Sequence, residues 1–345
     1  MTNEQWAKLI DVINGRLVDP IPVGFIIDSP WLPGWAGIST MDYYTSDEKW
    51  FRANLKAVQT FPDVIFLPGF WAEFGMCTEP SAFGTKCRWA DTQPPFAEKI
   101  LRDIKDIEDL QKPDPATDGL LPFVINRLKN CRPRIEQAGH SIRFAVSRGP
   151  LNIASFLMGT TEFLMAIRTH PSEVRTLLTT ITGFIIDWLA LQKKTFPTID
   201  GVLILDDMVG FLGPDDFQQA ALPYLREIFH CFEATVKFLH NDANGLICAP
   251  FLQEIGVNLF NFSFEHSLAQ MKALTNSAVT LLGNIPPVDV LANGTPDQVV
   301  ASIESAFEAL ADKSRIILSC GAGMPPGVPT NNINAFTLAA KAAFL

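Results

Sequence analysis

Residues 201–242 read GVLILDDMVGFLGPDDFQQAALPYLREIFHCFEATVKFLHND, with a short apolar run at each end and a longer segment between them. The runs GVLILDD (201–207) and TVKFLHND (235–242) are rich in branched and aromatic side chains, which is typical of strands buried on both faces. The segment 213–234 has helical periodicity. Strand, helix and strand in this order predict one parallel βαβ unit.

The same kind of apolar run recurs on both sides of this unit. Six further runs are IPVGFII (21–27), DVIFLP (63–68), IRFAVS (142–147), LFNFSF (259–264), VTLLGNI (279–285) and RIILSCG (315–321). With the two above they make eight, the number of parallel strands that closes a barrel. We therefore predict an α/β protein, a (β/α)8 TIM barrel with N-terminal and loop insertions.

The segments between the runs predict helices and one insertion. Helices are expected at 46–59 with Ser46 as N-cap, at 159–193, at 213–234, and at 295–311 with Thr295 as N-cap. The stretches 69–100 and 101–140 are longer than a tight βα loop and form an insertion at about 69–140. Because no repeat or flexible linker divides the chain, we predict a single domain over 1–345.

Charge and composition restrict the possible partners. A formal net charge of −10 and a pI near 5.0 argue against nucleic acid and against an anionic membrane surface. The first residues show no signal-peptide pattern, and apolar stretches such as GFIIDWLALQ (183–192) are judged too short and interrupted to span a bilayer. A cytoplasmic protein with six reduced cysteines is expected.

Reactive side chains stand at the ends of nearly all the predicted strands, which is where a barrel carries its active site. They are Asp28, Arg148, Asp206, Asp207, His240, Asp242, Ser263, Glu265, Asn284 and Cys320. Strand ends meet water and are often polar for that reason alone, so each residue singly has an ordinary explanation. The convergence of His, Asp, Glu and Cys at one end of a barrel indicates a site.

Four of these residues suit a metal ion. His240 and Asp242 are two positions apart and point to the same side of an extended strand, while Glu265 and Cys320 arrive from other strands. Zinc accepts imidazole nitrogen, thiolate sulfur and carboxylate oxygen, and three such ligands leave one position for substrate. No HExxH, CxxC pair, GxxxxGK, GxGxxG or GxSxG motif is present, so a buried histidine with satisfied hydrogen bonds is the alternative reading of His240.

Several segments, in order along the chain, resemble the uroporphyrinogen decarboxylase superfamily. They are GRLVDPIPVGF, GPLNIASFLMGTTEFLMAIRTHPSEV, DDMVGFLGPDDFQQAALPYLREIF, LLGNIPPVDVLANGTPDQV and SCGAGMPPGVPTNNINAF. The resemblance implies a TIM barrel over nearly the whole chain. The decarboxylase branch carries an arginine-rich motif near its start that binds substrate carboxylates, but the matching region here, DPIPVGFIIDSPWLPG (19–34), contains no arginine.

The other branch resembled consists of zinc methyltransferases that move a methyl group between a corrinoid (cobalamin) on a partner protein and a thiol such as coenzyme M. That branch uses a His-x-Cys pair and a later Cys as ligands, which His240 and Cys320 match. Asp242 replaces the first cysteine, and Glu265 is a further ligand by the same resemblance. A carboxylate makes a harder zinc site that favours an oxygen ligand over a thiol.

The resemblance therefore implies a zinc-dependent methyltransferase acting on a small methylated substrate or acceptor. Asp206 or Asp207 would orient the substrate or move a proton, Arg148 would hold an anionic part of it, and Asn284 would supply a hydrogen bond. A homodimer is expected only by analogy with the family. Two alternatives stay open: a metal-independent decarboxylase or lyase with Asp28 or Asp207 as its acid, and a non-catalytic relative that binds a ligand or a partner protein.

Overall fold

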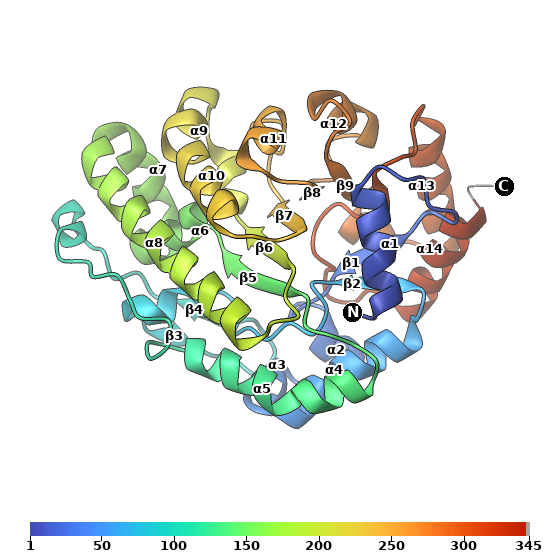
Figure 1. Ribbon diagram of the computed structural model, residues 1–345, viewed down its shortest axis with the longest axis horizontal. Helices are drawn as coiled ribbons and strands as arrows, with labels where there is room; N and C mark the ends of the chain where they lie inside the picture. Colours follow the sequence, from blue (N-terminus) through green and yellow to red (C-terminus); the bar gives the residue numbers. More distant parts are fainter. Residues whose placement is uncertain (343–345) are drawn as a thin grey trace.

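The computed structural model describes residues 1–342, and its centre is an eight-stranded parallel sheet that curls into a barrel-like ring (Figure 1). The strands are β1 (Val23–Ile26), β2 (Val64–Leu67), β5 (Phe144–Arg148), β6 (Gly201–Leu205), β7 (Val236–Asn241), β8 (Leu259–Phe262), β9 (Thr280–Ile285) and β10 (Ile316–Cys320). Their order is β2-β1-β10-β9-β8-β7-β6-β5. All eight predicted runs are strands, so the predicted α/β, TIM-barrel-like class is confirmed.

Within residues 1–342 the ring has one seam, between β2 and β5, where no strand pairing is made. Along the edge of β5 that faces the seam, side chains make the hydrogen bonds that a neighbouring strand would make. The amide of Gln192 accepts from Val146 N and donates to Val146 O, both at 2.9 Å, and Glu79 Oε1 accepts from Arg148 N at 3.1 Å. Both backbone groups of Val146 and the N–H of Arg148 are thereby satisfied, as buried backbone groups require.

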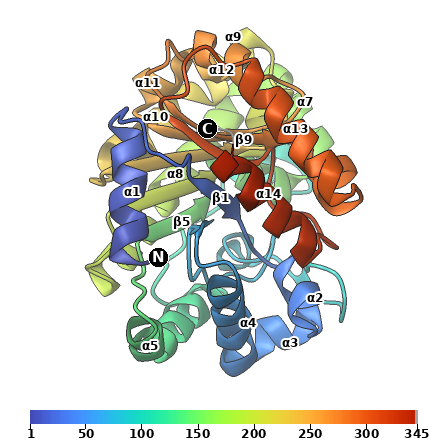
Figure 2. The ribbon, with the colours of Figure 1, turned by 90° about the vertical axis from the view of Figure 1, so that its right-hand side faces the viewer.

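The inside of the ring is a packed apolar core, and α1 (Asn3–Ile13) contributes to it. Leu9, Val12 and Ile13 pack with inward-facing side chains of the strands, and the rings of Trp6 and Phe144 meet edge to face with centroids 5.6 Å apart. In Figure 2, α1 lies on one side of the strands, opposite α13 and α14. The first helix thus adds apolar cover to the barrel interior.

The remaining helices surround the ring and form a second, larger core against its outer face. They are α2 (Leu32–Ala36), α3 (Thr40–Thr45), α4 (Asp47–Thr60), α5 (Leu121–Gln137), α6 (Pro150–Met158), α7 (Thr160–Thr169), α8 (Pro171–Thr195), α9 (Pro214–Ala220), α10 (Leu222–Cys231), α11 (Leu252–Ile255), α12 (Leu268–Leu274), α13 (Pro296–Glu308) and α14 (Thr330–Ala342). The two predicted N-caps are present, because Ser46 Oγ accepts from Lys49 N and Thr295 forms a capping box with Gln298.

Two segments predicted as single helices are each divided in two. The segment 159–193 breaks between α7 and α8 at His170, directly before Pro171, and the segment 213–234 breaks between α9 and α10 at Ala221, before Leu222 and Pro223. Proline lacks the amide hydrogen and disfavours helical geometry in the residue before it. Both breaks therefore follow from prolines that the periodicity alone did not weigh.

The expected insertion contains little regular structure apart from α5. It holds the short hairpin of β3 (Cys87–Arg88) and β4 (Phe96–Ala97) and two 3-10 turns, Pro80–Phe83 and Ile104–Ile107. Further short turns follow the later strands, at Asp207–Phe211 and Ala249–Phe251 and, as a π-helical turn, at Pro287–Ala292.

One described helix, α8, is long and apolar enough by length and composition to cross a membrane. It has 25 residues and a window of mean hydropathy 1.4, so the apolar helix extends beyond the GFIIDWLALQ stretch on which the expectation rested. Half of that window is buried, and Leu177, Ile181 and Trp188 belong to the core outside the ring. The bent pair α6 and α7 meets the same criterion only if counted as one span.

Candidate metal centre

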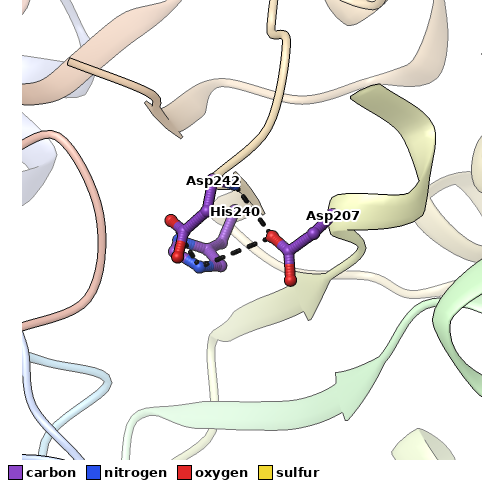
Figure 3. Close-up of side chains that lie close together, drawn as sticks. All are labelled: Asp207, His240 and Asp242. Carbon is purple, nitrogen blue, oxygen red and sulfur yellow. Dashed lines mark hydrogen bonds and ion pairs between the residues drawn. The ribbon is translucent and has the colours of Figure 1, made fainter. Parts of the chain in front are cut away.

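Three side chains meet at the carboxyl ends of β6 and β7. Asp207 lies two residues after β6, His240 lies near the end of β7, and Asp242 follows β7 directly. Nε2 of His240 is 3.0 Å from Oδ1 of Asp242 and 3.8 Å from Oδ1 of Asp207. One ligand atom from each residue lies within 4.8 Å of the other two, and Figure 3 shows the two carboxylates beside the imidazole.

The charges of these three side chains favour a bound cation. Burial would lower the pKa of His240, but the carboxylates of Asp242 and Asp207 raise it to about 9. Burial raises the pKa of Asp207, and the neighbouring carboxylate of Asp242 adds to that rise. A cation between the three groups would relieve the repulsion between the carboxylates.

The carboxylate of Asp207 is held in place from two sides. Its Oδ1 accepts from the backbone N–H of Asp242 at 2.8 Å, and its Oδ2 accepts from Nδ2 of Asn152 at 3.4 Å. Asn152 lies in α6, which follows β5, so three successive strand ends contribute to the arrangement. The sequence had assigned Asp207 an orienting role and not that of a ligand.

The far side of the imidazole is held by a residue that sequence reasoning missed. Nδ1 of His240 is 2.7 Å from Oδ1 of Asn261, which is fully buried in β8. Nδ2 of Asn261 donates to the carbonyl oxygens of Leu282 at 2.7 Å and Cys320 at 3.3 Å. A lone asparagine inside the apolar run LFNFSF was the available signal, since a buried amide needs partners.

The other two predicted ligands lie outside this three-residue group. Cys320 is fully buried at the end of β10, and its Sγ donates to the carbonyl oxygen of Ala322 at 3.1 Å. Burial raises the pKa of Cys320 to about 12. Glu265 is exposed in the loop after β8, where its backbone N–H donates to Ser263 Oγ. Of the four predicted ligands, the structure brings together His240 and Asp242.

Asp206 is not part of the three-residue group and binds the backbone at the start of α6 instead. It is fully buried, and its two oxygens accept from the backbone N–H groups of Leu151 and Asn152 at 2.9 and 3.0 Å. Burial raises its pKa well above the usual range. A Cβ on Gly149 would come within 2.2 Å of Asp206 Oδ2, so this contact requires glycine there.

Arg148, predicted to hold an anionic part of the substrate, already has anionic partners. Its guanidinium is 3.2 Å from Glu79 Oε2 and 3.4 Å from Glu73 Oε2. Asp28 interacts with the same group, and burial, with the Glu73 carboxylate adding to it, raises the pKa of Asp28 to about 8. The end of the ring near β1, β2 and β5 thus carries more carboxyl groups than cations.

Asn284, predicted to supply a hydrogen bond, uses its amide within the protein. It is buried at the end of β9, and its Nδ2 donates to the carbonyl oxygen of His266. The bond fixes the loop after β8, which also carries Glu265.

The aromatic residues after β1 and β2 mostly pack against one another and against α4. Trp31 stacks on Trp35 with ring centroids 4.9 Å apart, and Phe70 stacks on Phe51 at 5.8 Å. Phe74 instead lines a cavity of about 610 Å³ together with Tyr44, Trp89 and other residues of α3 and α5.

The donor set of the three-residue group suits a divalent transition metal. Catalytic zinc sites commonly have three nitrogen, oxygen or sulfur ligands and one open position, and one imidazole with two carboxylates meets that requirement. The side chains of Asp207 and Asp242 are 38% and 44% exposed, whereas that of His240 is 6% exposed. A small molecule could therefore approach from the carboxylate side.

Comparison with known proteins gives one family and one kind of fold. Residues 5–343 match the family model described as uroporphyrinogen decarboxylase (URO-D). The chain is 23% identical over 310 residues to the uroporphyrinogen decarboxylase of Xylella fastidiosa, covering 84% of this chain and 81% of that one. It is 25% identical over 268 residues to that of Chloroherpeton thalassium, covering 74% of each.

Two solved structures share the fold. A methyltransferase from Methanosarcina mazei superposes with a TM-score of 0.83 at 20% identity and covers 99% of both chains. A B12-independent methionine synthase from Shewanella superposes with a TM-score of 0.57 at 11% identity, covering 94% of this chain and 96% of that one.

Proposed function

Because this chain belongs to the uroporphyrinogen decarboxylase (URO-D) family, we propose that it is a zinc-dependent methyltransferase built on that family's barrel. The observation that carries the proposal is the meeting of Asp207, His240 and Asp242 at the ends of β6 and β7. The two structural neighbours, a methyltransferase and a methionine synthase, support the choice of reaction through the fold that they share.

The proposed ligands are Nε2 of His240 and one oxygen each from Asp207 and Asp242. Asp207 is a proposed metal ligand, whereas the sequence had indicated Cys320 and Glu265 for that role. When bound, zinc would supply Lewis acidity that lowers the pKa of the thiol or hydroxyl group that gains or loses the methyl group. The carboxylate-rich ligand set favours an oxygen-containing substrate over a soft thiol.

The protein's own residues limit the charge of that substrate. Arg148 is paired with Glu73 and Glu79, so it is not free to bind a substrate carboxylate. Asp28 lies in the same acidic surroundings. We therefore propose a small neutral or cationic methyl compound as the partner in the reaction, and not a polycarboxylate, because the carboxylates of Glu73 and Glu79 outnumber the one guanidinium group between them.

In this proposal the methyl group moves between that small compound and a corrinoid bound to a partner protein. Such a partner would approach the strand ends where Asp242 and Asp207 are partly exposed. Free methylcobalamin can stand in for it in an assay.

The test measures methyl transfer from methylcobalamin to a panel of small alcohols and thiols. The change in the absorbance of the corrinoid reports the transfer. We expect zinc-loaded protein to demethylate methylcobalamin in the presence of an acceptor, and we expect chelator and Asp242→Ala to abolish this activity. Asp215→Ala, which changes an exposed carboxylate in α9, is the control. Turnover that is unchanged in chelator would contradict the proposal.

A second candidate function is a metal-independent decarboxylase. The observation in its favour is Asp28, whose pKa of about 8 keeps its carboxyl group protonated at neutral pH and able to act as an acid. Carbon dioxide release from an acid substrate, retained in chelator and lost in Asp28→Asn, would favour this function over methyl transfer.

A further inference from the structure

The amide of Asn261 has one possible orientation. The side chain is fully buried, and one end of its amide faces the carbonyl oxygens of Leu282 at 2.7 Å and Cys320 at 3.3 Å. Carbonyl oxygens only accept hydrogen bonds, so the end that faces them must be the NH2 group. The oxygen of the amide therefore faces His240.

This orientation places a hydrogen on one ring nitrogen of the histidine. Oδ1 of Asn261 can only accept, and the atom 2.7 Å from it is Nδ1 of His240, so Nδ1 must carry a hydrogen. A metal-bound neutral imidazole has one N–H group, on Nδ1 here, and binds the metal through its other nitrogen, which carries a hydrogen of its own toward the acceptor Asp242 Oδ1 at 3.0 Å while no metal is bound. That nitrogen, Nε2, is the one that faces Asp242 and Asp207.

We propose that Asn261 is a positioning residue of the metal centre, which keeps the His240 proton on Nδ1 and presents the Nε2 lone pair to the metal. The proposal rests on the metal site proposed above. Through this amide, the imidazole on β7 is tied to the backbone of β9 and β10, so its ring orientation depends on three neighbouring strands. Hydrogen-bond partners of this kind typically change metal affinity about 10–100-fold when removed.

Two variants and one control separate this role from ordinary packing. Asn261→Leu removes the acceptor, whereas Asn261→Asp keeps an oxygen that can accept from Nδ1. The control is Asn332→Leu, because Asn332 is also buried and its Nδ2 also donates to two backbone carbonyls, those of Leu291 and Gly294, away from the metal centre. The control therefore removes a comparable amide whose hydrogen bonds go to Leu291 and Gly294.

The measurements are zinc affinity and long-range ¹H–¹⁵N correlation spectra of protein with labelled histidine, with the His240 signals assigned from His240→Gln. We expect zinc on Nε2 and hydrogen on Nδ1 in the wild type. Asn261→Leu should lose about 10–100-fold in zinc affinity, Asn261→Asp should recover most of it, and Asn332→Leu should bind as the wild type does. Zinc on Nδ1, or unchanged affinity in Asn261→Leu, would overturn the proposal.

The spectra also test the role of Asn261 in protein that contains no metal. Should the wild type bind no zinc, the proposed function fails, but the presence of a hydrogen on Nδ1 of His240 can still be read in metal-free protein. Hydrogen on Nδ1 there supports the role of Asn261, and a bare Nδ1 refutes it, whether or not Nε2 also carries a hydrogen. This reading of the wild type also decides the case if Asn261→Leu does not fold.

Discussion

His240 occupies a position that its own strand and the next one determine together. The register pairs His240 with Leu205 of β6 on one side and with Asn261 of β8 on the other. Asp207, two residues beyond Leu205, then comes level with the loop that carries Asp242, whose backbone N–H binds it. The strand register brings the three side chains to the same level, and the backbone hydrogen bond from Asp242 holds Asp207 there.

The sequence predicted part of this arrangement. His240 and Asp242, two positions apart at the end of one predicted strand, could be assigned to one side from strand geometry alone. Asp207 could not be placed, because the chain turns into a 3-10 helix immediately after β6 and the alternation of a strand ends there. The direction of the Cys320 thiol, toward Ala322 O, was likewise set by a local turn that apolar periodicity does not reveal.

Asp207 gives a direct test of the ligand set. Asp207→Asn keeps the shape of the side chain but removes a charged ligand, so zinc affinity should fall by more than about 100-fold, beyond the usual effect of an outer hydrogen-bond partner. Isothermal titration with zinc measures this. The matched change Asp215→Asn in α9 should leave affinity unchanged, and equal affinity in both variants would remove Asp207 from the site.

Asp242 gives a test of substrate preference. Asp242→Cys replaces a hard carboxylate by a soft thiolate and should shift methyl transfer from hydroxyl acceptors toward thiol acceptors. The ratio of kcat/KM for a matched alcohol and thiol measures the shift. A ratio that does not change on this substitution would show that the ligand's softness does not govern the choice of acceptor.

At the scale of elements, the seam between β2 and β5 is the least regular part of the ring. No strand pairing joins the two strands, and Gln192 of α8 reproduces two hydrogen bonds of a missing neighbour. The sequence predicted all eight strands, but a glutamine side chain acting as a strand partner has no periodic signature. The same holds for the helix breaks at Pro171 and Pro223, which depend on single residues within otherwise continuous patterns.

The seam can be tested through stability. Gln192→Leu leaves the N–H and C=O of Val146 buried without partners, and the free energy of unfolding should fall by about 2–4 kcal/mol. Urea denaturation measures the change, with Gln218→Leu on an exposed face of α9 as the control at about 0.5 kcal/mol or less. Equal midpoints for the two variants would mean that the seam does not need this amide.

At the scale of the whole molecule, the residues that stabilise the barrel and the residues proposed to bind metal lie in different places. The apolar interior, with α1 packed into it, contains none of the proposed ligands, whereas the strand ends collect carboxyl groups around one histidine. The fold class followed from the number and spacing of apolar runs because a buried parallel sheet requires them. The charge balance at the strand ends did not follow, since it depends on Glu73 and Glu79, which the insertion delivers to Arg148.

The most direct test of a metal-dependent enzyme is the metal content of untagged protein, by elemental mass spectrometry, for the wild type, His240→Ala and Asn332→Leu. We predict about one zinc per chain in the wild type and in Asn332→Leu, and none in His240→Ala, because His240 supplies the one nitrogen ligand of the three-residue group. Folded wild-type protein without metal, or a His240→Ala variant that retains it, would contradict the account.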